Sequence, residues 1–366
     1  MKIAFDFQIF SQQNYGGISR YNSILAEELS KLDQDVSIFT GIHRNNYLSS
    51  LPTGLVKGFK LSKYPPKTGR LFLKMNQHFT DYQMRQWKPN VIHETYYSAS
   101  KNNLNNTPRV VTAHDTVHEL FSKSFNKNDN ITERKIIAFN RADHIISISH
   151  NTKKDLIDFF GINPEKITVI HHGVFPTLNN HHHLNETSGK AFILYVGPRG
   201  GYKNFNNFLK AVSISQKLVD EFDIVAFGGG CLSPCEQTLI YSLGFKKDQV
   251  RQVGGNDLIL ASLYQNATAF IYPSLYEGFG MPPLEAMTFQ CPVISSNTSS
   301  MPEIVGEAGE YFNPAKVESI KVAIENVVFS PSRIKYLKEK GLERIGDFSW
   351  KKCAENTLSI YKDLIG

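Results

Sequence analysis

The sequence is poor in cysteine and has no long hydrophobic run. Only four of its 366 residues are cysteine, and residues 231–235 read CLSPC, which is not a C-x-x-C redox pair. Sparse cysteines exclude a disulfide-stapled scaffold and predict free thiols. The longest apolar runs, such as residues 191–196, are far shorter than the ~20 residues of a membrane-spanning helix. Asp6 interrupts the apolar N-terminus, which predicts a first β-strand rather than a signal peptide, so we expect a cytoplasmic protein.

Two common phosphate-binding signatures are also missing. No G-x-G-x-x-G segment follows the first predicted strand, and no acidic residue lies at the ribose-binding offset, which disfavours a nicotinamide-binding site. The G-x-x-x-x-G-K-[ST] pattern of P-loop NTPases is absent as well. A nucleotide site in this chain must therefore use another arrangement of glycines and cations.

Positive charge is present in excess, but only in the first half of the chain. Residues 1–180 carry 22 Lys and Arg against 15 Asp and Glu, whereas residues 181–366 carry 18 against 19. The densest stretch, residues 57–88, has eight cations and one acid, Asp81. A basic half favours an anionic partner such as a phosphorylated substrate, an anionic membrane or nucleic acid. A solvated surface explains the same charges equally well.

Short β-rich apolar runs alternate with helical patterns along the whole chain. This order predicts an α/β fold with two doubly wound, Rossmann-like parallel sheets. The pattern is interrupted at residues 174–190, which contain His181–His183 and which we interpret as a linker rather than a metal site. We therefore expect a first domain at residues 1–173, a second at residues 191–348, and a final helix at residues 349–366 with Ser349 as its N-cap.

Two glycine-containing loops follow predicted strands, at the edge where ligands bind in parallel sheets. Gly16 and Gly17 open the first long helix, so a ligand could approach their backbone. Arg199 and Lys203 lie in the loop GPRGGYKN, where a guanidinium and an ammonium suit a diphosphate. An ordinary turn and a pair of solvated cations are the alternatives for these two loops.

A third loop carries two glutamates eight residues apart. Residues 273–287 read PSLYEGFGMPPLEAM, in which Glu277 precedes a helix that Pro282 or Pro283 is expected to open. Glu285 would then lie in the first helical turn, where capping the helix is its alternative role. If the loop folds back, both carboxylates and the backbone N–H groups of Gly278, Phe279, Gly280 and Met281 face one ligand. His114 ends another strand and is the fourth candidate, with a purely structural role as its alternative.

Together these segments resemble the retaining glycosyltransferases of family 4, which have the GT-B fold. The resemblance covers nearly the whole chain, is strongest at residues 191–315, and includes the family's E-x7-E pattern as Glu277 and Glu285. The opening residues 5–21 are similar to mannosyltransferase-like members of bacterial polysaccharide gene clusters. The resemblance implies two Rossmann-like domains facing a cleft, with the last helix crossing back to the first domain.

The resemblance also implies roles for the candidate residues. Arg199 and Lys203 match the residues that hold the donor diphosphate, and Glu285 matches the glutamate that binds the ribose. Glu277 and His114 match groups beside the transferred sugar, while Gly16 and Gly17 match the glycines near the distal phosphate. Two cations aimed at the departing diphosphate could replace a metal ion, so we expect neither a metal nor a cofactor. We expect Glu277 to orient the sugar rather than to act as a covalent nucleophile.

These roles predict a hexosyltransferase that moves mannose, from GDP-mannose as the best candidate, to a lipid-linked saccharide or other glycan. A UDP-sugar donor, a sugar-nucleotide epimerase and a non-catalytic sugar-nucleotide-binding subunit are the alternatives. Nucleic-acid binding is disfavoured because no recognised module is present. The basic residues near position 60 stand among apolar ones, which favours an anionic membrane or a lipid-diphosphate acceptor; these are Lys60, Lys63, Lys67, Arg70 and Lys74.

Overall fold

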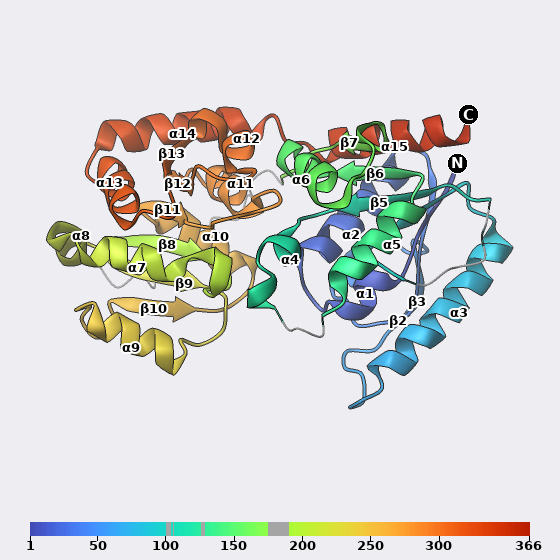
Figure 1. Cartoon of the computed structure of the whole chain (residues 1–366), viewed down its shortest axis with the longest axis horizontal. Helices are drawn as coiled ribbons and strands as arrows, with labels where there is room; N and C mark the ends of the chain where they lie inside the picture. The colour runs from blue at the N-terminus through green and yellow to red at the C-terminus, as the bar shows by residue number, and fades with distance from the viewer. Residues whose placement is uncertain (100–103, 105, 126–128, 175–189) are drawn as a thin grey trace. The chain divides into compact units, whose positions relative to one another are not determined.

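The chain folds into two compact units in a computed structural model that describes residues 1–99, 104, 106–125, 129–174 and 190–366 (Figure 1). The first unit comprises Met1–Gly173 and Ser349–Gly366, and the second comprises Val174–Phe348. Most of the predicted linker, including His181–His183, lies outside the described residues.

The described part of the first unit is built on a seven-stranded sheet with the order β3-β2-β1-β4-β5-β6-β7. All neighbouring strands in it are parallel. The strands are β1 (Lys2–Phe5), β2 (Asp35–His43), β3 (Val56–Lys60), β4 (Val91–Glu94), β5 (Arg109–Ala113), β6 (His144–Ser147) and β7 (Ile167–Val169).

The described part of the second unit contains a six-stranded sheet with the order β10-β9-β8-β11-β12-β13, again with parallel neighbours. Its strands are β8 (Phe192–Val196), β9 (Asp223–Phe227), β10 (Val250–Val253), β11 (Ala269–Tyr272), β12 (Val293–Ser296) and β13 (Gly309–Phe312). The central strands β8 and β11 are buried along their whole length, because helices cover both faces of a doubly wound sheet. Two Rossmann-like parallel sheets confirm the predicted fold class.

Helices connect the strands in both units. Those of the first unit are α1 (Gln8–Gln12), α2 (Gly17–Lys31), α3 (Gly69–Trp87), α4 (Val117–Leu120), α5 (Ile131–Arg141), α6 (His150–Phe160) and α15 (Trp350–Ile365). Those of the second are α7 (Phe205–Ser213), α8 (Gln216–Glu221), α9 (Pro234–Ser242), α10 (Asp257–Asn266), α11 (Met281–Thr288), α12 (Met301–Val305), α13 (Val317–Val328) and α14 (Pro331–Ile345). Among the residues described, no helix combines the length and the apolar composition that a membrane crossing needs.

The final helix α15 belongs to the first unit, as the resemblance implied. Ser349 caps it by accepting a hydrogen bond from the Lys352 N–H, which is the predicted N-cap. Its buried face packs on α2 and contributes Trp350, Ala354, Leu358 and Tyr361 to the first core. Ile365, the last residue of the helix, is exposed.

Each sheet reverses its strand order once. In the first sheet, the chain runs outward from β1 through β2 to β3, then returns to the other side of β1 and continues from β4. In the second sheet, the corresponding reversal lies between the neighbouring strands β8 and β11. At such a switch point the two connecting loops diverge, which leaves a crevice beyond the carboxyl ends of the strands.

A buried carboxyl fastens the two strands at the first switch point. Asp6 follows β1, and its Oδ1 accepts hydrogen bonds from the Thr95 N–H (2.9 Å) and the Thr95 hydroxyl (2.5 Å) beyond β4. The same oxygen accepts from the Gln8 N–H at 3.3 Å. Burial, with a further contribution from the Glu94 charge, raises the pKa of Asp6 to about 7.

We predict that Asp6→Asn becomes more stable relative to the unchanged protein as the pH rises from 4 to 7. The ordinary pKa of Asp6 is 3.8, so in this window the folded protein holds a proton that the unfolded chain releases. The free energy of unfolding therefore falls as the pH rises through the window, and an asparagine, which keeps an Oδ1 acceptor, cannot show this loss. Urea unfolding at several pH values measures the difference. Asp35→Asn, at an exposed position on β2, is the control, and identical pH dependence of the two variants would contradict the prediction.

Candidate functional site

An ion pair lies at the switch point of the second sheet. Lys203 ends the short 3-10 helix η4 (Gly201–Lys203) after β8, and Glu277 lies in the loop after β11. The Lys203 Nζ is 2.7 Å from Glu277 Oε1, and the two side chains are only 13% and 12% exposed. The ammonium also lies 5.2 Å from the ring centroid of Tyr202 and 5.5 Å from that of Tyr272. Two predicted site residues from distant loops thus meet where a parallel sheet binds ligands.

Two serines after β12 fix the loop that carries Glu277. The Glu277 N–H donates to the Ser299 hydroxyl at 2.9 Å. The Ser300 hydroxyl lies 2.8 Å from both the Glu277 and the Phe279 carbonyl oxygens, to which it can donate. Neither serine was predicted from the sequence, since their only signal is their place after a strand that neighbours β11. They fix the backbone from which the Glu277 side chain projects before any ligand arrives.

The helix after this loop begins one residue earlier than expected. Gly280 adopts a φ of +112°, and α11 starts at Met281, with Pro282 in its first turn. Glu285 is therefore half-buried in the second turn, and its predicted place in the first turn was wrong. A helix-capping role for Glu285 is thereby removed, because the dipole effect is confined to the first turn. A side chain at Gly280 would collide with Met301, so both backbone angle and space favour glycine there.

Arg199 occupies a different environment from Lys203. Its guanidinium donates to the carbonyl oxygens of Gly228 (2.8 Å), Gly230 (2.9 Å) and Cys231 (3.0 Å), and its Nε donates to Glu236 at 2.7 Å. Burial alone would raise the pKa of Glu236, but hydrogen bonds from Arg199 and Ser233 outweigh it and lower that pKa. The Arg199 side chain is 3% exposed. Its donors hold the loop after β9, whereas the Lys203 ammonium pairs with Glu277.

The candidate residues of the first unit surround the start of α2. Gly16 is the N-cap of α2 and Gly17 its first residue, and a side chain at Gly17 would meet no other atom. His114 follows β5, and its N–H donates to the Tyr97 hydroxyl at 3.1 Å. Its ring packs against Tyr21, with 5.3 Å between centroids. Burial lowers the pKa of His114 to about 4, so its imidazole is neutral at pH 7.

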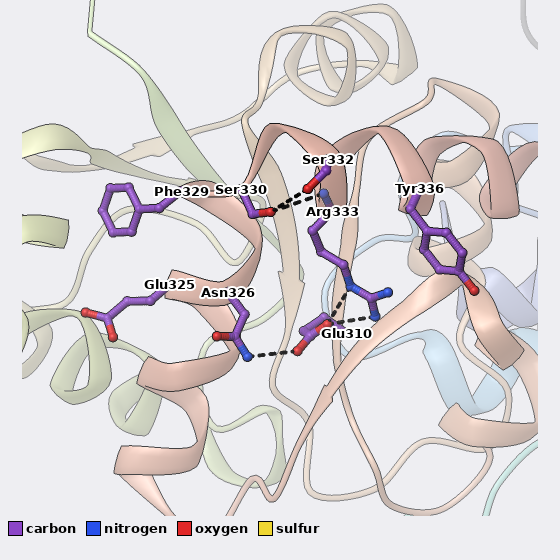
Figure 2. Close-up of a pocket in the computed structure, with 8 residues that line it drawn as sticks. All are labelled: Glu310, Glu325, Asn326, Phe329, Ser330, Ser332, Arg333 and Tyr336. Carbon is purple, nitrogen blue, oxygen red and sulfur yellow. Dashed lines mark hydrogen bonds and ion pairs between the residues drawn. The ribbon is translucent and has the colours of Figure 1, made fainter.

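The second unit also contains a pocket away from the switch point. Figure 2 shows this cavity of about 580 Å³ with side chains from β13, α13 and α14. Arg333 pairs with Glu310 at 2.8 Å, and Glu325 accepts from the Ser215 hydroxyl at 2.5 Å. Its charged side chains already have partners in the second unit, so we assign no ligand to it. Within the described ranges, no three His, Cys, Asp or Glu side chains converge where they could hold a metal ion.

Two protein-family models match consecutive parts of the chain. The model described as "Glycosyltransferase Family 4" matches residues 15–178, and that described as "Glycosyl transferases group 1" matches residues 177–344. The two matches abut near the boundary of the structural units at residues 173 and 174.

Curated proteins and solved structures show the same relationship. The O-antigen chain mannosyltransferase B of Escherichia coli is 32% identical over 178 residues, which are 47% of this chain and 46% of that protein. The O-antigen chain mannosyltransferase RfbU of Salmonella typhimurium is 28% identical over 197 residues, 53% of each. The matches thus span about half the length of these relatives. A sucrose-phosphate synthase from Thermosynechococcus elongatus superposes with a TM-score of 0.79 at 19% identity, covering 99% of this chain and 98% of that one, which shows the fold alone.

We predict that Arg199→Lys lowers the free energy of unfolding by roughly 2 kcal/mol or more, because a lysine cannot replace all the buried bonds of the guanidinium. Arg333→Lys keeps the charge in the same way but alters a partly exposed pair, so it should cost less than about 1 kcal/mol. Denaturant unfolding of both variants measures the difference. Equal and small losses would show that the buried bonds of Arg199 contribute nothing to stability.

Proposed function

Since the chain belongs to family 4 of the glycosyltransferases, we propose that it transfers a hexose from a nucleotide diphosphate sugar to a glycan acceptor, with retention at the anomeric carbon. The observation that carries the proposal is the Lys203–Glu277 pair at the second switch point. Mannose is our choice of sugar because the curated relatives compared above are named mannosyltransferases, and GDP-mannose is our choice of donor. A UDP-sugar donor is the alternative.

Lys203 supplies the positive charge for the departing diphosphate in this proposal. When the bond between the anomeric carbon and the phosphate oxygen breaks, its electron pair passes to that oxygen, and the sugar becomes oxocarbenium-like. The acceptor hydroxyl attacks from the same face, and its proton passes to the departing phosphate. An ammonium preorganised in a partly buried site stabilises the growing negative charge at little reorganisation cost. Glu277, held by Ser299 and Ser300, orients the sugar and stabilises positive charge on it.

The remaining candidates take supporting roles in the proposal. Glu285 binds the ribose, and backbone N–H groups between Gly278 and Met281 approach the donor. In the first unit, the neutral His114 contacts the sugar, and Gly16 and Gly17 let the distal phosphate approach the start of α2. A direct diphosphate contact by Arg199 would require its guanidinium to give up buried bonds to the loop after β9. We therefore assign the diphosphate to Lys203 first.

We predict that Lys203→Ala and Glu277→Ala each reduce hexosyl transfer at least a hundredfold, since each removes a charge that acts on the reacting bond. Release of nucleoside diphosphate from GDP-mannose in the presence of a mannosyl acceptor measures this. Lys210→Ala, an exposed position on α7 that no role above uses, is the matched control and should retain full activity.

Near-normal transfer by both site variants would refute the assignment. Donor binding without turnover, restored only by a partner protein, would favour a non-catalytic binding subunit. Conversion of the nucleotide sugar to its epimer without any acceptor would indicate an epimerase. Repeating the assay with UDP-glucose and with GDP-glucose, which differ only in the base, decides between the two donor bases.

We also propose that the first unit rests on the cytoplasmic face of an anionic membrane through α3 and β3. Helix α3 runs along the outer margin of the first unit beside β2 (Figure 1). Its exposed residues Leu71, Met75, Phe79 and Tyr82 follow helical spacing, while its buried face includes the polar Asn76 and Thr80. Phe59 on β3 is 75% exposed and lines the same groove as Met75 and Phe79. A group of exposed apolar side chains on one face is typical of an interaction surface.

The cations around this apolar face supply the complementary charge. Lys60 ends β3, Lys63 and Lys67 lie in the following loop, and Arg70 is in the first turn of α3. All four side chains are exposed, and among the described residues no carboxylate lies at ion-pair distance from any of them. Basic and apolar side chains on one face are the composition of a protein that lies on an anionic bilayer.

We predict that changing Lys60, Lys63, Lys67 and Arg70 to Gln weakens binding to phosphatidylglycerol vesicles at least tenfold. Each cation near the membrane surface contributes about 1 kcal/mol to the binding free energy. Vesicle cosedimentation measures this, with donor binding as the readout that should not change. The control variant removes four surface cations elsewhere: Lys210, Lys246, Lys335 and Lys351. Equal losses in both variants would indicate a net-charge effect and overturn the surface assignment.

A further inference from the structure

A cavity of about 490 Å³ lies at the switch point of the first sheet. Phe7 and Gln8 reach it from the segment after β1, and Tyr97 and Ser98 reach it from the loop after β4. Helices α3 and α5 complete its wall. The cavity therefore occupies the position in the first unit that corresponds to the Lys203–Glu277 pair in the second, beyond the strands where the order reverses.

The lining of this cavity combines three basic side chains with no acidic one. Lys74 and His78 lie one turn apart on α3, and Arg134 faces them from α5. No ion pair within the described residues engages Lys74 or Arg134. Unpaired cations that converge in a concave site favour an anion with several oxygens, such as a phosphate group.

The rest of the lining suits a saccharide or another polar group attached to that anion. Gln8, Gln12 and Gln77 contribute amides that can both donate and accept hydrogen bonds, and the rings of Phe7 and Tyr97 contribute apolar surface. The Tyr97 hydroxyl accepts the backbone hydrogen bond of His114. The cavity wall is thus joined directly to a residue that we place beside the transferred sugar.

We propose that this cavity, which we name the acceptor pocket, binds a phosphate-bearing group of the acceptor through Lys74, His78 and Arg134. This inference rests on the proposed glycosyl transfer and names the chemical class of the acceptor. The pocket and the exposed apolar side chains of α3 use different sides of the helix, since Lys74 and His78 line the pocket whereas Leu71 and Met75 do not. A lipid in a bilayer that contacts the exposed apolar side chains of α3 would carry its diphosphate next to the acceptor pocket. A phosphorylated sugar supplies the same chemistry without a lipid.

Titration calorimetry on the full chain tests this with four probes: geranyl diphosphate, mannose 1-phosphate, inorganic phosphate and the uncharged methyl α-mannoside. The pocket variant is Lys74→Gln with Arg134→Gln. The matched control is Arg85→Gln with Lys154→Gln, which removes the same charge from exposed positions on α3 and α6 outside the lining. A third variant, Lys203→Ala, reports binding of the same probes at the donor site.

We expect geranyl diphosphate to bind the pocket variant at least tenfold more weakly than the unchanged protein, and the control and Lys203→Ala to stay within twofold. Selective loss of mannose 1-phosphate binding instead would support the pocket and assign it to a sugar phosphate rather than a lipid diphosphate. Loss of inorganic phosphate binding alone, equal losses in pocket and control variants, or loss confined to Lys203→Ala would each overturn the proposal. Methyl α-mannoside binding as tight as that of the anionic probes would overturn it as well.

Donor turnover, measured separately, distinguishes failure of this inference from failure of the proposed function. A chain that binds phosphorylated probes through Lys74 and Arg134 but never consumes a nucleotide sugar would contradict the transferase proposal and leave the anion site standing. A chain that transfers hexose normally in the pocket variant, from donor to a phosphate-bearing acceptor at unchanged KM, would contradict the acceptor pocket and leave the transferase proposal standing.

Discussion

Parallel strands can be joined only by crossovers, and this constraint governs where chemistry can occur in this molecule. All strands of a parallel sheet end at the same edge, so the loops that follow the strands lie together at that edge. Only where the strand order reverses do neighbouring loops leave in opposite directions. Each unit has one such place among its described strands, between β1 and β4 and between β8 and β11. The buried Asp6–Thr95 bonds fasten the first, and the Lys203–Glu277 ion pair occupies the second.

The ion pair also explains how a charged site can exist without its ligand. An ammonium and a carboxylate that are this deeply buried would each be costly alone, because a desolvated charge needs a partner. Lys203 and Glu277 meet that need for one another across 74 residues of sequence. An anionic ligand could take over Lys203 while the serines after β12 keep the Glu277 backbone in place. Arg199 differs because it also donates to several backbone carbonyls, which no ligand replaces at low cost.

The sequence predicts strands at residues 91–94, 192–196 and 250–253, which are the bounds of the buried strands β4 and β8 and of the partly buried strand β10. It missed β3 and β13, since β3 is an edge strand with exposed lysines and β13 is short and begins with glycine. The motif identified Lys203 and Glu277, but not that they pair with each other. The burial of Arg199 depends on how the distant segment Gly228–Cys231 folds, which no local pattern reports.

The path of the chain between the units makes the second unit an uninterrupted insertion. The first unit is discontinuous, ending at Gly173 and resuming at Ser349, whereas the second runs from Val174 to Phe348 without a break. The two ends of the insertion are adjacent, because the Val174 N–H donates to the Phe348 carbonyl at 3.2 Å. Gly173 lies so close to the Trp350 backbone that a side chain there would collide with it. At the level of the gene, one contiguous segment encodes a whole sheet with its helices. Excising that segment would leave two ends already close enough to rejoin.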